Sequence, residues 1–467
     1  MSASKKIFSA FLIFAFLFSA CVASNDSAAP TPRPSATPSG KPSAQETPTR
    51  AASRLNVEAE ALRGVQVTVW HPWFGAQASL FESQVAEFNK TNQWGIVVRA
   101  ESKENFSELY QQTTSALSNS TNPQIAIALP EYALEWKDNV VDLNAYLHDP
   151  EYGMSALEIS DFANAIWMQD EAGGIRYGLP AQRTARLILY NRTWARELGL
   201  DAAPTTPSEF DAQACAAHAA LGRDADKNND ALGGWLIDVH PMTALSWMRA
   251  FGGGAQEEQG YRFLTPENIA AFKFLKILQQ KNCAWVASTD LSVYDRFAAR
   301  QALFATAGLE ELPDQARAFL TSGNRDEWTV LPFPGAERDA IVVYGSSFVT
   351  FQSDDATRLA SWLFMRWALS PENQARWSQS ASLFPLRSST MNLLTDYAAT
   401  HPQWAEAVKL LSNGEITPQL ASWRSVRVML GDGFADMFDT IRHPDLTDGQ
   451  APGVLRQMDD TASELNK

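Results

Sequence analysis

The 467-residue chain has few cysteines, a deficit of positive charge and no strong candidate for a membrane-spanning segment. Asp and Glu outnumber Lys and Arg by 53 to 38. The resulting net charge of -15 argues against nucleic acid and against an anionic membrane surface as partners. The apolar run from Ile7 to Phe18 falls below the roughly 20 residues that cross a bilayer.

Short catalytic signatures are also missing. The sequence has no HExxH zinc motif, no GxSxG elbow and no Walker loop, and the glycines at 252–254 do not form a dinucleotide fingerprint. We therefore expect a protein that is not an enzyme and that carries no cofactor. A cell-surface glycoside hydrolase stays open, because two suitably spaced carboxylates suffice for that chemistry and leave no short signature. A carbohydrate-binding adhesin is a further alternative.

The first residues have the pattern of an export signal. Lys5 and Lys6 precede the apolar run, and the small residues Ser19 and Ala20 lead into Cys21. The segment LFSAC resembles a bacterial lipobox, although Phe18 replaces the usual Leu. We expect residues 1–20 to be a signal peptide and Cys21 to be lipidated, which would anchor the protein to the outside of the bacterial cell membrane. The alternative is an ordinary signal peptide cleaved elsewhere.

A Pro-, Ser- and Thr-rich stretch follows, and it is too poor in apolar residues to form a core. We interpret residues 21–65 as the anchor and a disordered linker, with the folded sequence starting near Gln66. If Cys21 carries lipid, Cys215 and Cys283 remain as a pair. In an oxidising compartment they can form a disulfide, and two buried free thiols are the alternative.

Apolar periodicity predicts alternating strands and helices. VQVTVW reads as a buried strand, SLFESQVAEFNKTN repeats apolar residues at helical spacing, and IVVRAES resumes a strand. Strand-like residues return at Leu187 to Tyr190, and APTTPSEF marks the start of another helix. Such alternation is typical of an α/β lobe with a largely parallel sheet. The chain length favours two lobes.

Several motifs in order form a recognisable series. They are VTVWHPW, GLPAQRTARLILYN, the TPSEF helix start, VLPFPG, YGSSFVTF, WALSPENQARW and FPLR. The series resembles family 1 of the extracellular solute-binding proteins of ABC importers, which includes binders of maltodextrin, other oligosaccharides and glycerophosphates. The resemblance covers nearly everything after Gln66, and it rests on the order of many motifs.

The resemblance implies a two-lobed, periplasmic-binding-protein-like α/β fold with hinge crossings and a solute cleft between the lobes. Residues 66–180 plus 339–390 would form lobe I, and residues 181–338 plus 391–467 would form lobe II. Such a protein acts as a monomer that closes by hinge motion and delivers its solute to an ABC permease. No bond is made or broken.

Candidate solute contacts follow from the carboxyl ends of the predicted strands, where open α/β sheets bind ligands. Trp70, His71 and Trp73 follow the first strand; Trp73 offers a stacking face and His71 a hydrogen bond. The alternative is that Trp70 lies in the core and His71 packs beside Pro72. Glu131 follows another strand and can accept hydrogen bonds from sugar hydroxyls, or it can be a solvated helix-start carboxylate.

The remaining candidates come from the resemblance and from strand ends. Gln182 and Arg183 fall in the crossing segment, where the family places polar contacts, although Arg183 can instead brace the hinge. Tyr344, Ser346 and Ser347 resemble the family's GGSS-type binding loop. NGEITPQLASWRSVR resembles the stretch of the maltodextrin binder with a sugar-stacking tryptophan. Trp423 in this stretch would stack on the sugar, or it would pack in the core as part of an amphipathic helix. The last candidate is Asp238, which lies at a strand end.

The segment from Asp224 to Asp230 has oxygen-bearing residues at alternating positions, as calcium loops do. It lacks the turn glycine and the terminal Glu of an EF-hand, so we interpret it as a solvated turn and expect no metal. Together these features predict a receptor for a sugar or oligosaccharide, held by aromatic stacking and polar groups. A glycerophosphate-type solute stays open, because several arginines could reach a phosphate.

Overall fold

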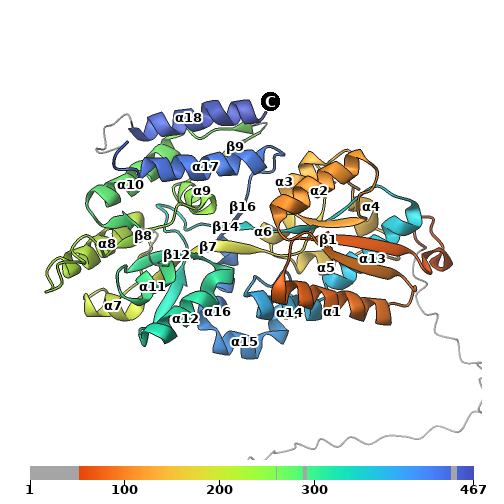
Figure 1. The fold of residues 1–467 in the computed structure, drawn as a ribbon, viewed down its shortest axis with the longest axis horizontal. Helices are drawn as coiled ribbons and strands as arrows, with labels where there is room; N and C mark the ends of the chain where they lie inside the picture. Colours follow the sequence, from red (N-terminus) through yellow and green to blue (C-terminus); the bar gives the residue numbers. More distant parts are fainter. Residues whose placement is uncertain (1–51, 259, 288–291, 443–449) are drawn as a thin grey trace, which may run out of the picture. The chain divides into compact units, whose positions relative to one another are not determined.

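The computed structural model describes residues 52–258, 260–287, 292–442 and 450–467 (Figure 1). The predicted signal peptide, Cys21 and the linker up to residue 51 lie outside the described residues.

The packed chain begins earlier than Gln66. The Ser53 hydroxyl donates a hydrogen bond to the Asp149 carboxylate at 3.0 Å, and Leu62 is fully buried in the first core. Leu62 ends a short 3-10 helix, Ala59–Leu62, that packs against a later helix of the first lobe, α13 (Asp355–Ala368). Polar and charged residues surround these few apolar anchors, which explains why composition alone placed the boundary too late.

The first lobe is built on a sheet of five strands in the order β2-β1-β3-β15-β6. β1 pairs in parallel with β2 and β3, whereas β15 runs antiparallel between β3 and β6. The strands are β1 (Gln66–His71), β2 (Val97–Ser102), β3 (Ile125–Ala128), β6 (Leu179–Pro180) and β15 (Ser347–Thr350), and a separate hairpin is formed by β4 (Glu171–Ala172) and β5 (Ile175–Arg176). A strand from late in the chain therefore completes this sheet.

Helices of the first lobe alternate with its strands, as the sequence predicts. They are α1 (Gly75–Thr91), α2 (Phe106–Ser118), α3 (Pro130–Glu135), α4 (Asn144–Leu147), α5 (Ala156–Ser160), α6 (Asn164–Trp167), α13 (Asp355–Ala368) and α14 (Pro371–Ala381). Ser370 caps α14 and Pro371 occupies its first turn, so the two residues separate α13 from α14.

The second lobe is built on a sheet of seven strands in the order β11-β8-β12-β7-β14-β16, with β13 also paired to β7. Its central strand β7 (Thr184–Asn191) is buried along its whole length. The others are β8 (Trp235–Ile237), β11 (Ala284–Val286), β12 (Phe304–Gly308), β13 (Trp328–Leu331), β14 (Ile341–Tyr344) and β16 (Gly414–Ile416), and β9 (Gln256–Glu257) pairs with β10 (Gly260–Tyr261) outside this sheet. The α/β fold class is thus confirmed in both lobes.

The second lobe also carries helices between its strands and after the last one, β16. They are α7 (Arg192–Glu197), α8 (Pro207–Leu221), α9 (Pro241–Ala250), α10 (Pro266–Gln280), α11 (Val293–Ala298), α12 (Leu312–Ser322), α15 (Thr395–Thr400), α16 (Pro402–Lys409), α17 (Trp423–Met437) and α18 (Gln450–Leu465). Further 3-10 turns are η2 (Met168–Asp170), η3 (Leu309–Glu311), η4 (Ser388–Leu393) and η5 (Leu410–Asn413). α17 and α18 lie side by side (Figure 1). α8 starts with the predicted signal, because Thr206 and Glu209 form a capping box around Pro207.

The chain passes between the two lobes three times. The last crossing in chain order lies between α14 of the first lobe and α15 of the second, before β16 joins the second sheet. The first two crossings are adjacent. One is residues 181–183, between β6 and β7, and the other is Gly345 with Ser346, between β14 and β15. The backbone N–H groups of Ala181 and Gln182 both donate to the Ser346 carbonyl. Since β14 pairs with β7, the strand that the sequence analysis assigned to lobe I through its boundary at residue 339 belongs to the second sheet. The change of lobe falls at Gly345.

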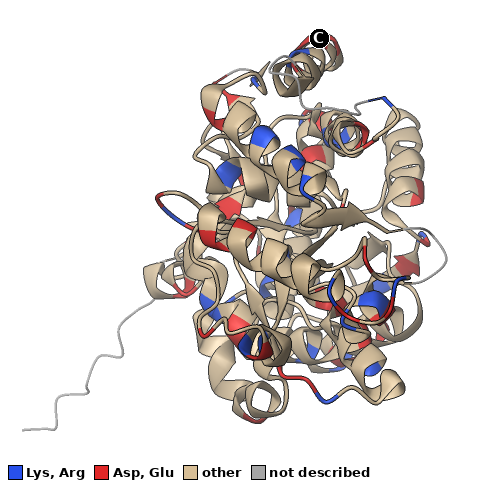
Figure 2. Cartoon of the chain, turned by 90° about the vertical axis from the view of Figure 1, so that its left-hand side faces the viewer, with Lys and Arg blue, Asp and Glu red and all other residues tan. Residues whose placement is uncertain are grey.

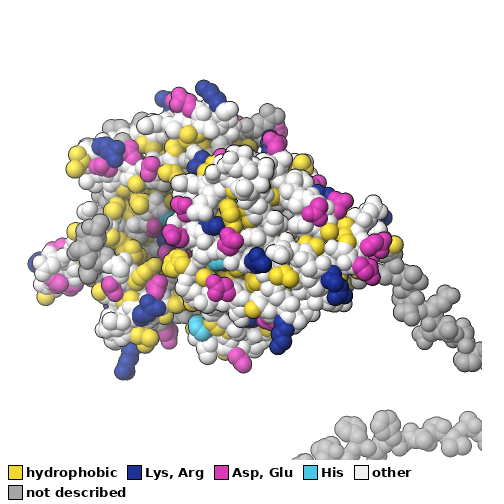
Figure 3. Space-filling model, turned by 45° about the vertical axis from the view of Figure 1, so that its right-hand side comes forward, with side chains coloured by type: hydrophobic (Ala, Val, Ile, Leu, Met, Phe, Trp, Pro, Cys, Tyr) yellow, Lys and Arg dark blue, Asp and Glu magenta, His cyan; other side chains and the backbone are white. Residues whose placement is uncertain are grey.

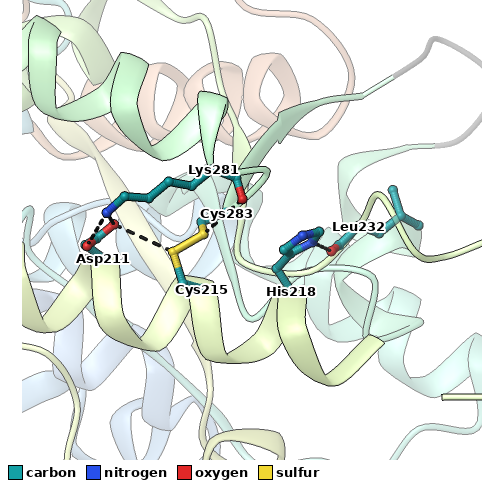
Figure 4. The surroundings of a disulfide bond; sticks show 6 residues. All are labelled: Asp211, Cys215, His218, Leu232, Lys281 and Cys283. Atoms are coloured by element: carbon teal, nitrogen blue, oxygen red, sulfur yellow. Dashed lines mark hydrogen bonds and ion pairs between the residues drawn. A yellow bond between two sulfur atoms is a disulfide. The ribbon is translucent and has the colours of Figure 1, made fainter. Parts of the chain in front are cut away.

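A disulfide joins Cys215 of α8 to Cys283, just before β11 (Figure 4). The prediction of a bridge is confirmed, and the alternative of two free thiols is not realised. The Lys281 ammonium pairs with the Asp211 carboxylate at 2.9 Å next to the bridge. On the other side the ring of His218 contacts the Leu232 carbonyl at 2.9 Å. The bridge therefore fastens α8 to the edge of the second sheet.

Positions of Lys and Arg and of Asp and Glu are interspersed along the ribbon in Figure 2, and on the face drawn in Figure 3 neither sign forms a continuous patch. Among the described residues, no helix has both the length and the apolar character that a bilayer crossing requires.

Candidate functional site

A cavity of about 60 Å3 lies between the two lobes. Its wall comes from the starts of α3, α9 and α17 and from the crossing after β14. The lining residues are Leu129, Pro130, Glu131, Gln169, His240, Pro241, Met242, Tyr344, Gly345, Thr417, Trp423 and Arg427. Water occupies about 30 Å3 per molecule in the liquid, so this space holds about two waters. A larger solute requires the lobes to separate.

A larger groove of about 730 Å3 also lies between the lobes. The first lobe contributes Leu134, Glu135 and Tyr177 to it, and the second lobe contributes residues 419–422 and the start of α17. Small-molecule sites typically measure about 300–1,000 Å3, so this groove has a suitable size. The interlobe space thus contains a narrow cavity at the start of α3 and a wide groove at its end.

Glu131 is the acidic group of the cavity. Pro130 starts α3 directly after β3, which brings the Glu131 carboxylate into the space between the lobes. The side chain is only 5% exposed, and its Oε1 lies 3.2 Å from Nε of Arg427 on α17. Burial raises the pKa of Glu131, and Arg427 opposes that rise. A buried carboxylate of this kind needs a donor, which is either a guanidinium or a solute hydroxyl.

Trp423 is the aromatic residue of the cavity. It is the first residue of α17 and is 1% exposed. Its ring stacks on Tyr261 with centroids 6.2 Å apart, and it also belongs to the second hydrophobic core. The two interpretations from the sequence are therefore compatible, because the same indole packs into the core and lines the cavity.

Two rings at the ends of β8 and β14 form the neutral polar side of the cavity. His240 and Tyr344 stack with centroids 6.0 Å apart. Burial and the charge of Arg186 lower the pKa of His240 to about 4, so the imidazole is neutral at pH 7. Burial, together with Glu310, raises the pKa of Tyr344, which keeps its hydroxyl protonated. Asp238 does not line the cavity, because it pairs with Arg186 at 2.8 Å.

Gln169 supplies an acceptor that the sequence analysis missed. It lies in the 3-10 turn η2 and is 4% exposed. Its amide nitrogen donates to the Ala165 carbonyl at 2.9 Å, while its Oε1 is buried and has no donor among the described residues. Leaving such an atom unpaired costs about 1–3 kcal/mol, which a solute hydroxyl would recover. No strand end precedes Gln169, so the strand-end rule could not find it.

Four predicted contacts lie at the crossings and outside the cavity lining: Gln182, Arg183, Ser346 and Ser347. Arg183 is fully buried, and its Nη2 lies 2.7 Å from Oδ2 of Asp170 and 3.2 Å from Oγ of Ser347. It also donates to the Ser346 carbonyl. Arg183 therefore connects the two adjacent crossings through these contacts. The Oγ of Ser346 is buried and unpartnered among the described residues.

The aromatic residues after β1 also lie outside the cavity lining. Trp73 is 5% exposed, packs on Trp377 with centroids 4.6 Å apart and donates its indole N–H to Gln182 at 3.0 Å. His71 is 1% exposed, and burial together with Lys103 lowers its pKa to about 4.

Trp70 and Phe74 lie on either side of these two residues. The indole N–H of Trp70 donates to Glu101 at 2.9 Å, and the Lys103 ammonium lies 4.0 Å from the centre of its ring. Phe74 is 78% exposed, and it is the aromatic side chain that this loop presents to solvent. The sequence analysis passed over Phe74 in favour of its tryptophan neighbours.

Side chains of the segment 224–230 contact one another. Asn229 donates to the Asp224 carboxylate at 2.9 Å, and the Lys227 ammonium lies 3.5 Å from Asp230. Throughout the described ranges, no group of three or more His, Cys, Asp or Glu side chains is arranged to hold a metal ion.

Solved structures of solute-binding proteins share this fold. The sugar-binding protein MalE of Xanthomonas citri aligns with a TM-score of 0.74 at 20% identity, over 86% of this chain and 97% of that one. The cyclic alpha-maltosyl-1,6-maltose binding protein of Arthrobacter globiformis gives 0.72 at 19% identity, over 86% and 99%. UgpB of Mycobacterium tuberculosis, solved with glycerophosphocholine, gives 0.65 at 18% identity, over 86% and 98%.

A comparison with curated protein sequences gives no match. The family model described as "Bacterial extracellular solute-binding protein" matches residues 83–411, which is well over half of the chain. The members of this family bind solutes outside the cytoplasm. The two-lobed fold and this match together show that the chain belongs to the bacterial extracellular solute-binding protein family.

Proposed function

We propose that this protein is the solute receptor of an ABC importer and that it binds a sugar or oligosaccharide between its two lobes. The unpaired Oε1 of Gln169 carries the proposal. It is a buried acceptor on a residue of the cavity wall, and it has no hydrogen-bond donor among the described residues. Trp423 adds an aromatic surface, and Tyr344 adds a hydroxyl in the same wall. An apolar ring beside a few convergent polar groups suits the alternating C–H and O–H faces of a sugar.

The charge of the cavity favours an uncharged solute. Its lining contains one carboxylate, Glu131, and one guanidinium, Arg427, which pair with each other. His240 adds no charge at pH 7. A phosphodiester would have to take Arg427 from Glu131 and leave a buried carboxylate without its partner, which is costly. A hydroxylated solute can instead donate to Glu131 and accept from Arg427 together.

The similar structures support the same class of solute. Two of them are a MalE and a cyclic maltosyl-maltose binding protein, and a third was solved with glycerophosphocholine. Because of this third structure, a phosphodiester remains the competing class of solute, and the experiment has to include one.

We also propose that the receptor is a lipoprotein anchored through Cys21 to the outer face of the cell membrane. The basic start, the apolar run and the small residues before Cys21 support this anchor. The Pro-rich linker would then let the folded body reach a permease.

Binding measured by calorimetry and by thermal shift tests the proposal on the full chain. A panel of mono- and oligosaccharides and glycerophosphocholine should contain a sugar that raises the melting temperature without being consumed. Trp423→Ala should weaken the binding of that sugar by at least about 1 kcal/mol, which is about five-fold in Kd. Trp423→Phe should keep most of the affinity. Trp70→Ala is the matched control, because Trp70 lies outside the cavity lining.

Two outcomes would contradict the proposal. Release of product from a sugar would show a glycosidase. Tighter binding of glycerophosphocholine than of every sugar would show that the charge argument fails.

A further inference from the structure

Two ion pairs connect α3 of the first lobe to α17 of the second. Glu131 Oε1 lies 3.2 Å from Arg427 Nε, and Glu135 Oε2 lies 3.3 Å from Arg424 Nε. Residues four apart on α3 and three apart on α17 share one face of their helix. The two helices therefore face each other across the lobes with matched charges.

The outer pair, Glu135 with Arg424, is placed against the preference of its own helices. Glu135 is the last residue of α3, where the helix dipole disfavours a carboxylate, and Arg424 is the second residue of α17, where it disfavours a cation. Neither residue supports its own helix by its charge. The opposite charge that each one pairs with lies on the other lobe.

A third side chain holds the outer pair in place. The Tyr110 hydroxyl of α2 donates to the Glu135 carboxylate, and the Arg424 guanidinium lies 4.4 Å from the centre of the Tyr110 ring. The tyrosine thus contacts both partners, through a hydrogen bond and through a cation–π contact. Such an arrangement limits the side-chain freedom that usually weakens exposed ion pairs.

The two pairs differ in their relation to a bound solute. The Glu131–Arg427 pair lines the cavity, so a solute that enters the cavity competes with it. The side chains of Glu135 and Arg424 are 36% and 38% exposed and line the wider groove. A solute in the cavity therefore competes directly with the inner pair and not with the outer one.

We propose that Glu135 and Arg424 are positioning residues that hold the closed state of the receptor, with the lobes joined at the outer edge of the cleft. This rests on the proposed function only in assuming that solute binds between the lobes. An exposed ion pair of this kind changes the ratio of closed to open molecules by roughly two- to five-fold, and salt weakens it.

The distance between the lobes, measured by single-molecule fluorescence without solute, tests the proposal directly. Dyes on Gln111→Cys of α2 and Arg456→Cys of α18, in the full chain with Cys21→Ser, report that distance, since both sites are exposed. Glu135→Gln and Arg424→Gln should each increase the open fraction about two- to five-fold, and the double variant should add little. Exchanging the charges, Glu135→Arg with Arg424→Glu, should restore closure in part, because the pair re-forms without the Tyr110 hydrogen bond to a carboxylate.

A matched control is Glu87→Gln, which breaks the Glu87–Arg376 pair between α1 and α14 inside the first lobe. It should leave the distance distribution unchanged. The proposal is overturned if Glu135→Gln and Glu87→Gln behave alike, or if 0.5 M salt leaves the closed fraction unaffected.

Solute binding is measured separately on the same variants. A shift in closure without any sugar binding would refute the proposed function and leave the ion pair established. Sugar binding with unchanged closure would support the proposed function and refute the role of the ion pair.

Discussion

Replacing Asp170 by Asn should strongly destabilise the protein, because it leaves the Arg183 charge buried without a counter-ion. Arg183 and Asp170 have side chains that are 0% and 1% exposed, with Nη2 and Oδ2 2.7 Å apart. Water cannot replace the carboxylate at such a site. Removing one partner of a buried pair costs about 3–5 kcal/mol, whereas an exposed pair contributes about 0–1 kcal/mol. We therefore expect Asp170→Asn to lower the free energy of unfolding by about 3–5 kcal/mol.

Urea denaturation followed by tryptophan fluorescence and by circular dichroism measures this loss. Glu327→Gln is the matched control, because its partner Arg196 is 55% exposed and Glu327 is 69% exposed. The double variant Asp170→Leu with Arg183→Met removes both charges and should recover much of the loss. A loss for Asp170→Asn no larger than that for Glu327→Gln would refute the reasoning from burial.

Three further outcomes follow from other contacts. Reducing the Cys215–Cys283 bridge, which closes a separation of 68 residues, should cost up to about 4 kcal/mol of unfolding free energy, and urea midpoints with and without dithiothreitol measure it. The pKa of His71 lies at about 4 in the folded protein, below its ordinary value of 6.5, so stability is fully present above pH 6.5 and falls by at most about 3 kcal/mol as the pH drops to 4. His71→Gln should flatten that pH dependence, and an unchanged slope would contradict the assignment. Gln169→Leu should weaken solute binding about two- to ten-fold in calorimetry, because it removes the unpaired acceptor Oε1, and it should cost about 1 kcal/mol of unfolding free energy, because the hydrogen bond from the amide nitrogen to the Ala165 carbonyl is lost.

The fold was predictable because many local signals agree with it. Apolar periodicity predicts β7, and Thr206 with Pro207 predicts the start of α8. The motif order predicts the family that the family model confirms. The boundary at residue 339 was not predictable from these signals, since the sequence around β14 and β15 is strand-like throughout and only pairing decides which sheet each strand joins.

The candidate site was predictable only in part. Glu131, Tyr344 and Trp423 line the cavity, whereas Trp73 packs in the core and Arg183 connects the two adjacent crossings. Sequence position locates a strand end but not the direction of each side chain there. Burial decides that direction, because a large aromatic ring gains more free energy when it packs against its neighbours than when it is exposed in an open cleft.

The late position of β15 in the chain has a consequence for export. β15 lies between β3 and β6, so the first sheet lacks an interior strand until about residue 350 has been synthesised. Until then the growing polypeptide cannot bury the edges of those two strands against their native neighbour. Pairing of such sequence-distant segments is slow. The interleaved order thus keeps the nascent protein loosely folded for longer, which suits threading through a secretion channel before the native state forms.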